Sequence, residues 1–196
     1  ISGGKVVAKS NTNSAGIGGG CSITKGSSSS KLNGGDAIVN ISGNPIIRTG
    51  SIGGGTTGAG QGKIGSAQIT ISGGDIQAQF VMMNTGTGTK PKFEMSGGTI
   101  RNSYVDDEEY IHIKEQGGAV YLENGTFTMS GGTIKNCSAV QGGAVYINSQ
   151  SGTSTFTMTG GEIHSCFATG TYNNVGSLIN PGHGGAVCLM GGQVNI

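Results

Sequence analysis

The sequence predicts an all-β solenoid of about six coils, in which short strands stack in parallel along one axis. Two short phrases recur along the chain, and each contains a Gly-Gly pair. Glycine supplies 41 of the 196 residues and charged residues only 11%, against about 25% charged in typical globular domains. The glycines keep fixed positions within the repeat, which excludes the Gly-X-Y lattice of collagen. The continuous repeat favours one domain over residues 1–196.

The first phrase is an apolar alternation that ends in a glycine corner. It reads FEMSGGTI at 93–100, FTMSGGTI at 127–134 and FTMTGGEI at 156–163. A period of two with β-branched and aromatic residues indicates strands, and Gly-Gly indicates a bend where no side chain fits. We therefore expect short strands on either side of each corner and buried columns of like side chains. The predicted columns are Phe93/Phe127/Phe156, Met95/Met129/Met158 and Ile100/Ile134/Ile163.

The second phrase follows the first within each repeat. It reads GGAVYL at 117–122, GGAVYI at 142–147 and GGAVCL at 184–189. Both alternating sets are fairly apolar, so either Val and Leu or Ala and Tyr could face inward. The column of Val120 and Leu122 with their equivalents is the more uniformly apolar one, and we expect it to face inward.

The upstream half repeats the corner with isoleucine in place of methionine. Ile1, Ile41 and Ile71 each precede Ser-Gly, and successive corners lie 24 to 40 residues apart up to Ile196. Ile1 and Ile196 hold the same position in the repeat, so both ends fall in mid-repeat. We therefore expect the chain to be a fragment of a longer solenoid.

These phrases resemble the right-handed parallel β-helix repeats of bacterial surface proteins, including adhesins and polymorphic outer-membrane proteins. The upstream half, with IGGG at 17–20 and IVNISG at 38–43, resembles the Gly-rich repeats of large secreted proteins from gut Firmicutes. The resemblance covers essentially the whole chain and implies a single-stranded right-handed β-helix. It further implies an extracellular or cell-surface module for adhesion or display, non-catalytic, with a host or microbial surface glycan or protein as its partner.

Loop lengths single out one candidate binding face. Residues 101–116 and 164–183 form long insertions at one position in the repeat, and the connection at 135–141 between them is short. Insertions at one phase lie on one side of a solenoid and often bind ligands, so we expect them to flank a shallow depression. Tolerated surface insertions are the alternative. The candidate ligand-binding residues, suited to sugar stacking and hydroxyl recognition, are Tyr104, Asp106, Asp107, Glu108, Glu109, Tyr110, His112, Phe167, Tyr172, Asn173, Asn174 and His183.

The alternative function is a glycan-binding or polysaccharide-cleaving β-helix. Glycoside hydrolysis needs two carboxylates close together, and the ten acidic residues are thinly spread, so we predict no catalytic residue. The four acids at 106–109 are typical of a solvated loop, and calcium ligation is a weaker alternative; no cofactor is expected. The chain has no CxxC or Cys–His spacing for a metal site. A net charge of +1 argues against nucleic-acid binding, and no apolar run predicts membrane insertion of this segment.

Two of the four cysteines share a position in neighbouring coils. Cys137 and Cys166 both follow the first phrase by three residues. Neighbouring strands place equivalent Cα atoms about 4.8 Å apart, within the range that a disulfide accepts. Stacked side chains point the same way, however, so free buried thiols that act as small hydrophobes are the alternative.

Overall fold

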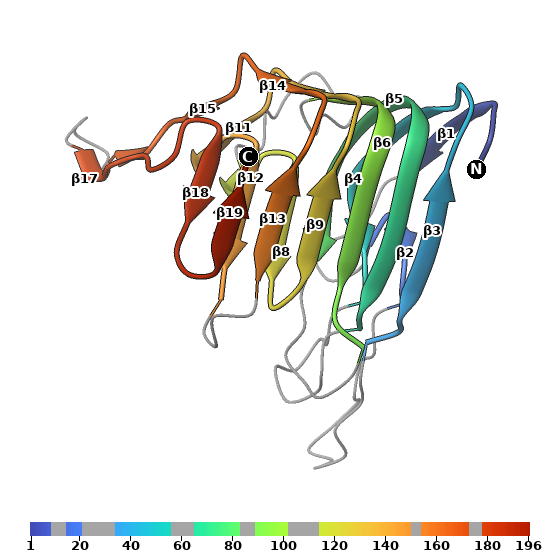
Figure 1. Ribbon diagram of the computed structural model, residues 1–196, viewed down its shortest axis with the longest axis horizontal. Coiled ribbons are helices and arrows are strands. Elements are labelled where there is room, and N and C mark those ends of the chain that lie inside the picture. Colours follow the sequence, from blue (N-terminus) through green and yellow to red (C-terminus); the bar gives the residue numbers. More distant parts are fainter. Residues whose placement is uncertain are drawn as a thin grey trace, which may run out of the picture.

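The computed structural model describes residues 1–8, 15–20, 34–55, 65–82, 89–101, 114–149, 154–172 and 178–196. These residues are all-β and include no helix, as the sequence predicts, and hence none that could span a membrane. Most of the strands pair in parallel and build one large sheet that nearly closes on itself like a barrel (Figure 1). The strands are β1 (Lys5–Ala8), β2 (Ile17–Gly18), β3 (Ala37–Ile41), β4 (Ile46–Gly53), β5 (Ala67–Met82), β6 (Lys92–Arg101), β7 (Lys114–Gln116), β8 (Val120–Glu123), β9 (Thr126–Met129), β10 (Thr133–Lys135), β11 (Ser138–Gln141), β12 (Val145–Asn148), β13 (Thr155–Met158), β14 (Glu162–His164), β15 (Phe167–Ala168), β16 (Thr171–Tyr172), β17 (Leu178–Asn180), β18 (Val187–Leu189) and β19 (Gln193–Asn195).

Three rows of parallel strand pairs make up the large sheet. One row runs β3-β5-β6-β9-β13-β19, a second runs β2-β4-β5-β8-β12-β18, and a third runs β1-β4-β5-β6-β10-β14. Strand β5 takes part in all three rows and so joins them into a single 14-stranded sheet. In Figure 1 the strands of the first row lie side by side in colour order from blue to red. Successive repeats of the sequence therefore become neighbours in space.

The phenylalanine column of the first phrase is confirmed. The rings of Phe93 and Phe127 lie 4.6 Å apart between centroids, and those of Phe127 and Phe156 lie 4.7 Å apart. All three side chains are fully buried. Phe80 of β5 extends the stack with a centroid distance of 4.8 Å to Phe93. This fourth ring was not predicted, because Phe80 lies outside the repeated phrase.

The methionine and isoleucine columns are confirmed by the strand register. Met95, Met129 and Met158 are aligned across β6, β9 and β13, and the isoleucines across β6, β10 and β14. In the second phrase Val120, Leu122, Val145 and Ile147 are fully buried, as expected, but Ala119, Ala144 and Tyr146 are buried as well, so burial favours the expected set clearly only in β8. In β18, the last strand of this row, Cys188 is buried and Leu189 is 45% exposed.

The strands at the glycine corners after Ile71 and Met95 differ from the prediction, whereas β3 and β4 are separate strands on either side of the corner after Ile41, as predicted. The sequence predicted short strands interrupted at each Gly-Gly pair, but β5 and β6 run through their corners without a break. The pairing of β5 with β6 shifts register on both sides of Ser72, and Gly74 and Gly98 have positive φ of 97° and 82°. Local irregularity of this kind bends a strand while keeping it in the sheet. At the later corners, β9 and β10 are separate strands, as predicted, and so are β13 and β14.

Glycine is required at these corners because the backbones of neighbouring strands approach closely. A Cβ on Gly131 would lie 2.5 Å from the carbonyl oxygen of Ser96, and one on Gly160 would lie 2.5 Å from that of Ser130. A second bend follows β10 and β14, where Asn136 and Ser165 adopt left-handed φ of 52° and 54°. Asn is among the non-glycine residues that tolerate this conformation best. The repeat therefore bends at two fixed positions.

Candidate functional site

The predicted ligand-binding residues fall largely outside the part of the chain that the structure describes. Those of the first insertion lie within 102–113, and Asn173 and Asn174 lie within 173–177. Phe167 lies in β15 with its side chain 57% exposed, and His183 is exposed. The backbone of Tyr172 lies in β16, which pairs antiparallel with β17. The residues outside are Tyr104, Asp106, Asp107, Glu108, Glu109, Tyr110, His112, Asn173 and Asn174.

The described ends of the two insertions lie on either side of the short connection. A three-stranded parallel sheet has the order β15-β11-β7. Its central strand β11 belongs to the connection at 135–141, and its outer strands belong to the two insertions. The backbone N–H of Gly142 donates a hydrogen bond to the His183 carbonyl at 2.8 Å. This arrangement leaves Phe167 exposed at one side of the small sheet; a depression at this face stays a prediction.

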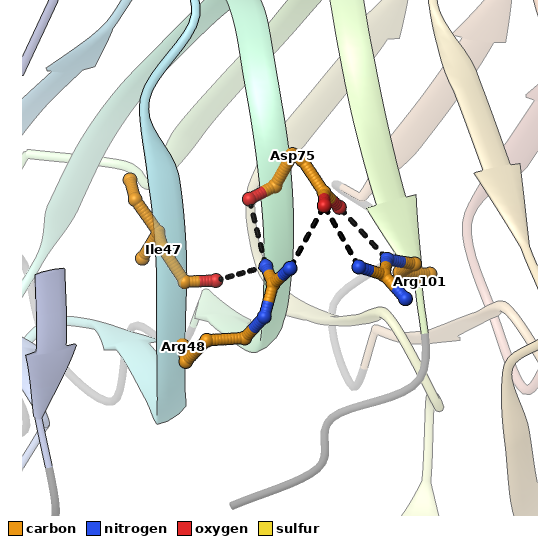
Figure 2. A network of polar contacts seen from close by, with 4 residues as sticks. All are labelled: Ile47, Arg48, Asp75 and Arg101. Atoms are coloured by element: carbon orange, nitrogen blue, oxygen red, sulfur yellow. Dashed lines mark hydrogen bonds and ion pairs between the residues drawn. The ribbon is translucent and has the colours of Figure 1, made fainter. Parts of the chain in front are cut away.

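A charged cluster joins strands β4, β5 and β6. Asp75 lies between Arg48 and Arg101, which reach toward it from the two neighbouring strands (Figure 2). Arg101 Nε and Nη2 donate to the two carboxylate oxygens at 2.8 and 2.7 Å, and Arg48 Nη2 donates to Oδ2 at 2.8 Å. Arg48 Nη1 also donates to the carbonyls of Ile47 and Asp75 at 2.9 and 3.0 Å. The cluster ties three successive strands together and carries a net charge of +1.

Asp75 stays ionised over nearly the whole pH range. The hydrogen bond from Arg101 is the largest cause that lowers its pKa to about 2, against the opposing effect of burial and with further help from Arg48. A carboxyl group with so low a pKa cannot donate a proton near neutral pH. Asp75 is therefore unsuited to act as the general acid that glycoside hydrolysis requires.

A shallow groove of about 600 Å³ lies beside this cluster, at the glycine corners that follow Ile41, Ile71 and Met95. Its lining comes from residues 43–46 and 72–75 together with Gly98, and Asp75 is the ionisable group among them. Glycine leaves much of the surface as exposed backbone, which offers hydrogen-bonding groups and no aromatic ring. The groove fits a small polar ligand better than an apolar one.

A column of four basic side chains and one glutamine, the basic column, crosses the same row of strands. Arg48, Gln77, Arg101, Lys135 and His164 are aligned in register on β4, β5, β6, β10 and β14. Asp75 forms ion pairs with both arginines. Lys135 is half-buried and His164 is exposed. The sequence analysis did not identify this column. The signal was present, because each of these residues directly follows an inward isoleucine, such as Ile100 or Ile134.

Three other described carboxylates have polar partners of their own and lie on different strands or connections. Glu94 forms an ion pair with Lys92 at 2.8 Å, and Asp36 Oδ1 accepts a hydrogen bond from the Ser66 N–H at 2.7 Å. Glu123 is nearly buried, and its Oε2 accepts from the Tyr121 hydroxyl at 3.3 Å. Within the described ranges, no group of three or more His, Cys, Asp or Glu side chains could hold a metal ion.

No family model, curated protein or solved structure matches this chain.

Proposed function

We propose that this chain is a non-catalytic β-helix module of an extracellular bacterial surface protein, used for adhesion or display. The observation that carries the proposal is the stacking of like residues through successive parallel strands, as in the phenylalanine column. Such stacking makes a rigid scaffold whose outward side chains form regular rows. Function in a scaffold of this kind depends on those rows and on insertions rather than on the core.

The fold that we propose is a single-stranded right-handed parallel β-helix of about six coils. Each parallel pairing joins positions about one repeat apart, such as Val39 with Ile69, Phe93 with Phe127 and Ile134 with Ile163. A chain that winds in coils produces this pattern, and parallel crossovers are right-handed in about 98% of cases. The three rows of strand pairs would then be three faces of the coil, which the long strand β5 connects.

Spin labels test the winding. With the four native cysteines replaced by serine, cysteine replacements at Thr128, Thr157 and Asn195 place nitroxides on β9, β13 and β19, which are aligned in register. We expect strong dipolar broadening between neighbouring positions, near 5 Å between backbones, and weaker coupling across two strands, near 10 Å. Equal coupling in all pairs, or none between neighbours, would contradict a coil. A crystal structure with left-handed crossovers would contradict the hand.

The composition supports the surface location. Charged residues are few, glycine is abundant, and the outward positions of β9 hold exposed threonines at Thr126 and Thr128. These features suit a repetitive surface protein whose partner is a host or microbial glycan or protein. The test is adhesion of protein-coated beads to epithelial and bacterial cells, with beads carrying heat-unfolded protein as the control. Release of reducing ends from any polysaccharide would overturn the non-catalytic assignment.

Glycan binding is the second candidate function. It is favoured by the exposed ring of Phe167 and by the nearby Lys135, since sugars stack on aromatic faces and acidic glycans attract cations; His164, next to Lys135 in the column, is a further exposed polar group. A glycan array should show binding that Tyr110→Ala and Tyr172→Ala abolish. Thr128→Ala, on another row of strands, is the matched surface control. Binding that survives both tyrosine replacements would place the partner elsewhere on the molecule.

A further inference from the structure

Cys137 and Cys166 occupy equivalent places in neighbouring strand connections. The pairs on either side are in register, Lys135 with His164 and Ser138 with Phe167. The Phe167 N–H donates to the Cys137 carbonyl at 3.1 Å, which ties the two connections directly at the cysteines. Parallel neighbours with this spacing have Cα atoms about 4.8 Å apart, inside the range of disulfides.

The two side chains also share one local geometry. Each Sγ lies 3.2 Å from the carbonyl oxygen two residues earlier, that of Lys135 or His164. Each cysteine follows a left-handed residue and lies outside the regular strands. Both cysteines are free, and Cys166 Sγ also lies 4.0 Å from the carbonyl oxygen of Ile134, on the neighbouring strand that leads to Cys137. The register and this contact place the two side chains beside each other.

The two thiols differ in reactivity. Cys137 is fully buried. Its interaction with the Cys166 thiol and its burial both raise its pKa. Cys166 is half-buried, and the hydrogen bond from Cys137 lowers its pKa to about 7, against the effect of burial. The thiolate is the nucleophile in disulfide exchange, and a thiol with a pKa near the ambient pH attacks best. Cys166 is thus the attacking thiol, and Cys137 is placed to resolve the intermediate.

We propose that Cys137 and Cys166 form a cross-strand disulfide by exchange with a small-molecule disulfide such as oxidised glutathione. The Cys166 thiolate attacks one sulfur of the oxidant and expels one glutathione thiolate, which leaves a mixed disulfide. Cys137 then loses its proton and attacks Cys166 Sγ, which expels the second glutathione. The protein loses two hydrogens and is oxidised by two electrons, and one oxidised glutathione becomes two reduced ones. An extracellular location would supply oxidising conditions, but the chemistry does not depend on the adhesion proposal.

The bond would fasten the candidate binding face. It would join the short connection at 135–141 to the start of the insertion at 164–183, directly beside Phe167. A crosslink here closes a 30-residue loop from position 137 to 166. Restricting such a loop in the unfolded chain should raise the melting temperature by about 10 °C.

The experiment incubates the full chain with oxidised or reduced glutathione and counts free thiols by alkylation and intact mass. We expect the oxidised protein to lose two alkylation sites, to contain a 137–166 linked peptide, and to melt about 10 °C higher than the reduced protein. Cys166→Ser should abolish the link and the shift, whereas Cys188→Ser should retain both. In Cys137→Ala, the alkylation rate of Cys166 should rise with pH around a pKa above that in the wild type.

Two results would overturn the proposal. One is that Cys137 and Cys166 both stay alkylatable under denaturing conditions after the folded protein has equilibrated with oxidised glutathione. The other is that the linked peptide joins Cys188 or Cys21 instead. Circular dichroism of each variant separates these results from loss of the fold. If Cys166→Ser does not fold, the wild-type peptide map alone decides.

Discussion

Replacing Phe127 by alanine tests the stacked core most directly. The ring is fully buried and lies between two others, 4.6 Å from Phe93 and 4.7 Å from Phe156. Truncating a buried phenylalanine costs about 3–5 kcal/mol, because transfer energy is lost and a cavity remains. Each aromatic pair adds about 0.5–1.5 kcal/mol to burial. We expect the upper half of the range, about 4–5 kcal/mol.

Phe156 provides a graded comparison within the same column. It has Phe127 on one side, and its register partner on the other side is the aliphatic Val194. Phe156→Ala should therefore cost about 1 kcal/mol less than Phe127→Ala, the contribution of one aromatic pair. Phe167→Ala is the exposed control, and it should change stability by less than about 0.5 kcal/mol.

The assay is urea denaturation followed by far-ultraviolet circular dichroism, with the slope of the transition checked for each variant. Domains of this size are stable by about 5–15 kcal/mol in total, so Phe127→Ala should shift the transition far toward low urea. A loss below about 1.5 kcal/mol would refute the argument, because no tightly stacked ring could be removed so cheaply. Equal losses of stability in Phe127→Ala and Phe156→Ala would refute the contribution assigned to the additional aromatic pair.

Three further predictions follow from the corners and the titrating groups. Gly131→Ala should destabilise the protein by more than about 2 kcal/mol in urea denaturation, because its Cβ would lie 2.5 Å from the Ser96 carbonyl oxygen. Gly3→Ala is the control and should be neutral, because a Cβ at position 3 would have no atom within 4 Å. The lowered pKa of Asp75, about 2 against 3.8, means that its stabilisation is present above pH 4 and is lost as the pH falls toward 2. Discounted for a side chain that is 39% exposed, this is about 1 kcal/mol, and Asp75→Asn should remove that part of the acid dependence in melting curves. Burial, and secondarily Glu123, raises the pKa of Tyr121 to about 12 from 10.0, so stability should fall as the pH rises from 10 to 12, and Tyr121→Phe should reduce this loss. The difference between the 295 nm titrations of the wild type and Tyr121→Phe isolates this one of the five tyrosines, and a difference centred near pH 10 would contradict the prediction.

The sequence predicted the columns because like residues recur at like positions, and stacking follows from a repeat that winds. It could not predict Phe80, whose ring enters the phenylalanine stack from a part of β5 that carries no repeated phrase. It was wrong about the continuity of β5 and β6, because a Gly-Gly pair permits either a break or a bend within a paired strand. The antiparallel pair β16–β17 lies in an insertion, where repetition gives no information.

The chemistry of the surface was harder to predict than the core. The cluster of Arg48, Asp75 and Arg101 depends on how far side chains reach across three strands, which spacing along the chain does not encode. The proximity of Cys137 to Cys166 was visible from the shared phase, but the opposite shifts of their pKa values depend mainly on the interaction between the two thiols, while burial raises both. Repeats therefore specify neighbours well and side-chain environments poorly.

The separate candidates for function converge on one part of the molecule. In the basic column, Asp75 forms ion pairs with the two arginines. Lys135 and His164 are the two basic residues of the column that Asp75 does not contact. These two residues lead directly into the bends that carry the thiol pair, and β15 with the exposed Phe167 follows. If one ligand spans this region, Lys135→Gln and Phe167→Ala should weaken binding less together than the sum of their separate effects. Strict additivity would instead indicate that the two residues contribute independently, and no loss of binding in Lys135→Gln would leave the basic column without a part in ligand recognition at the insertions.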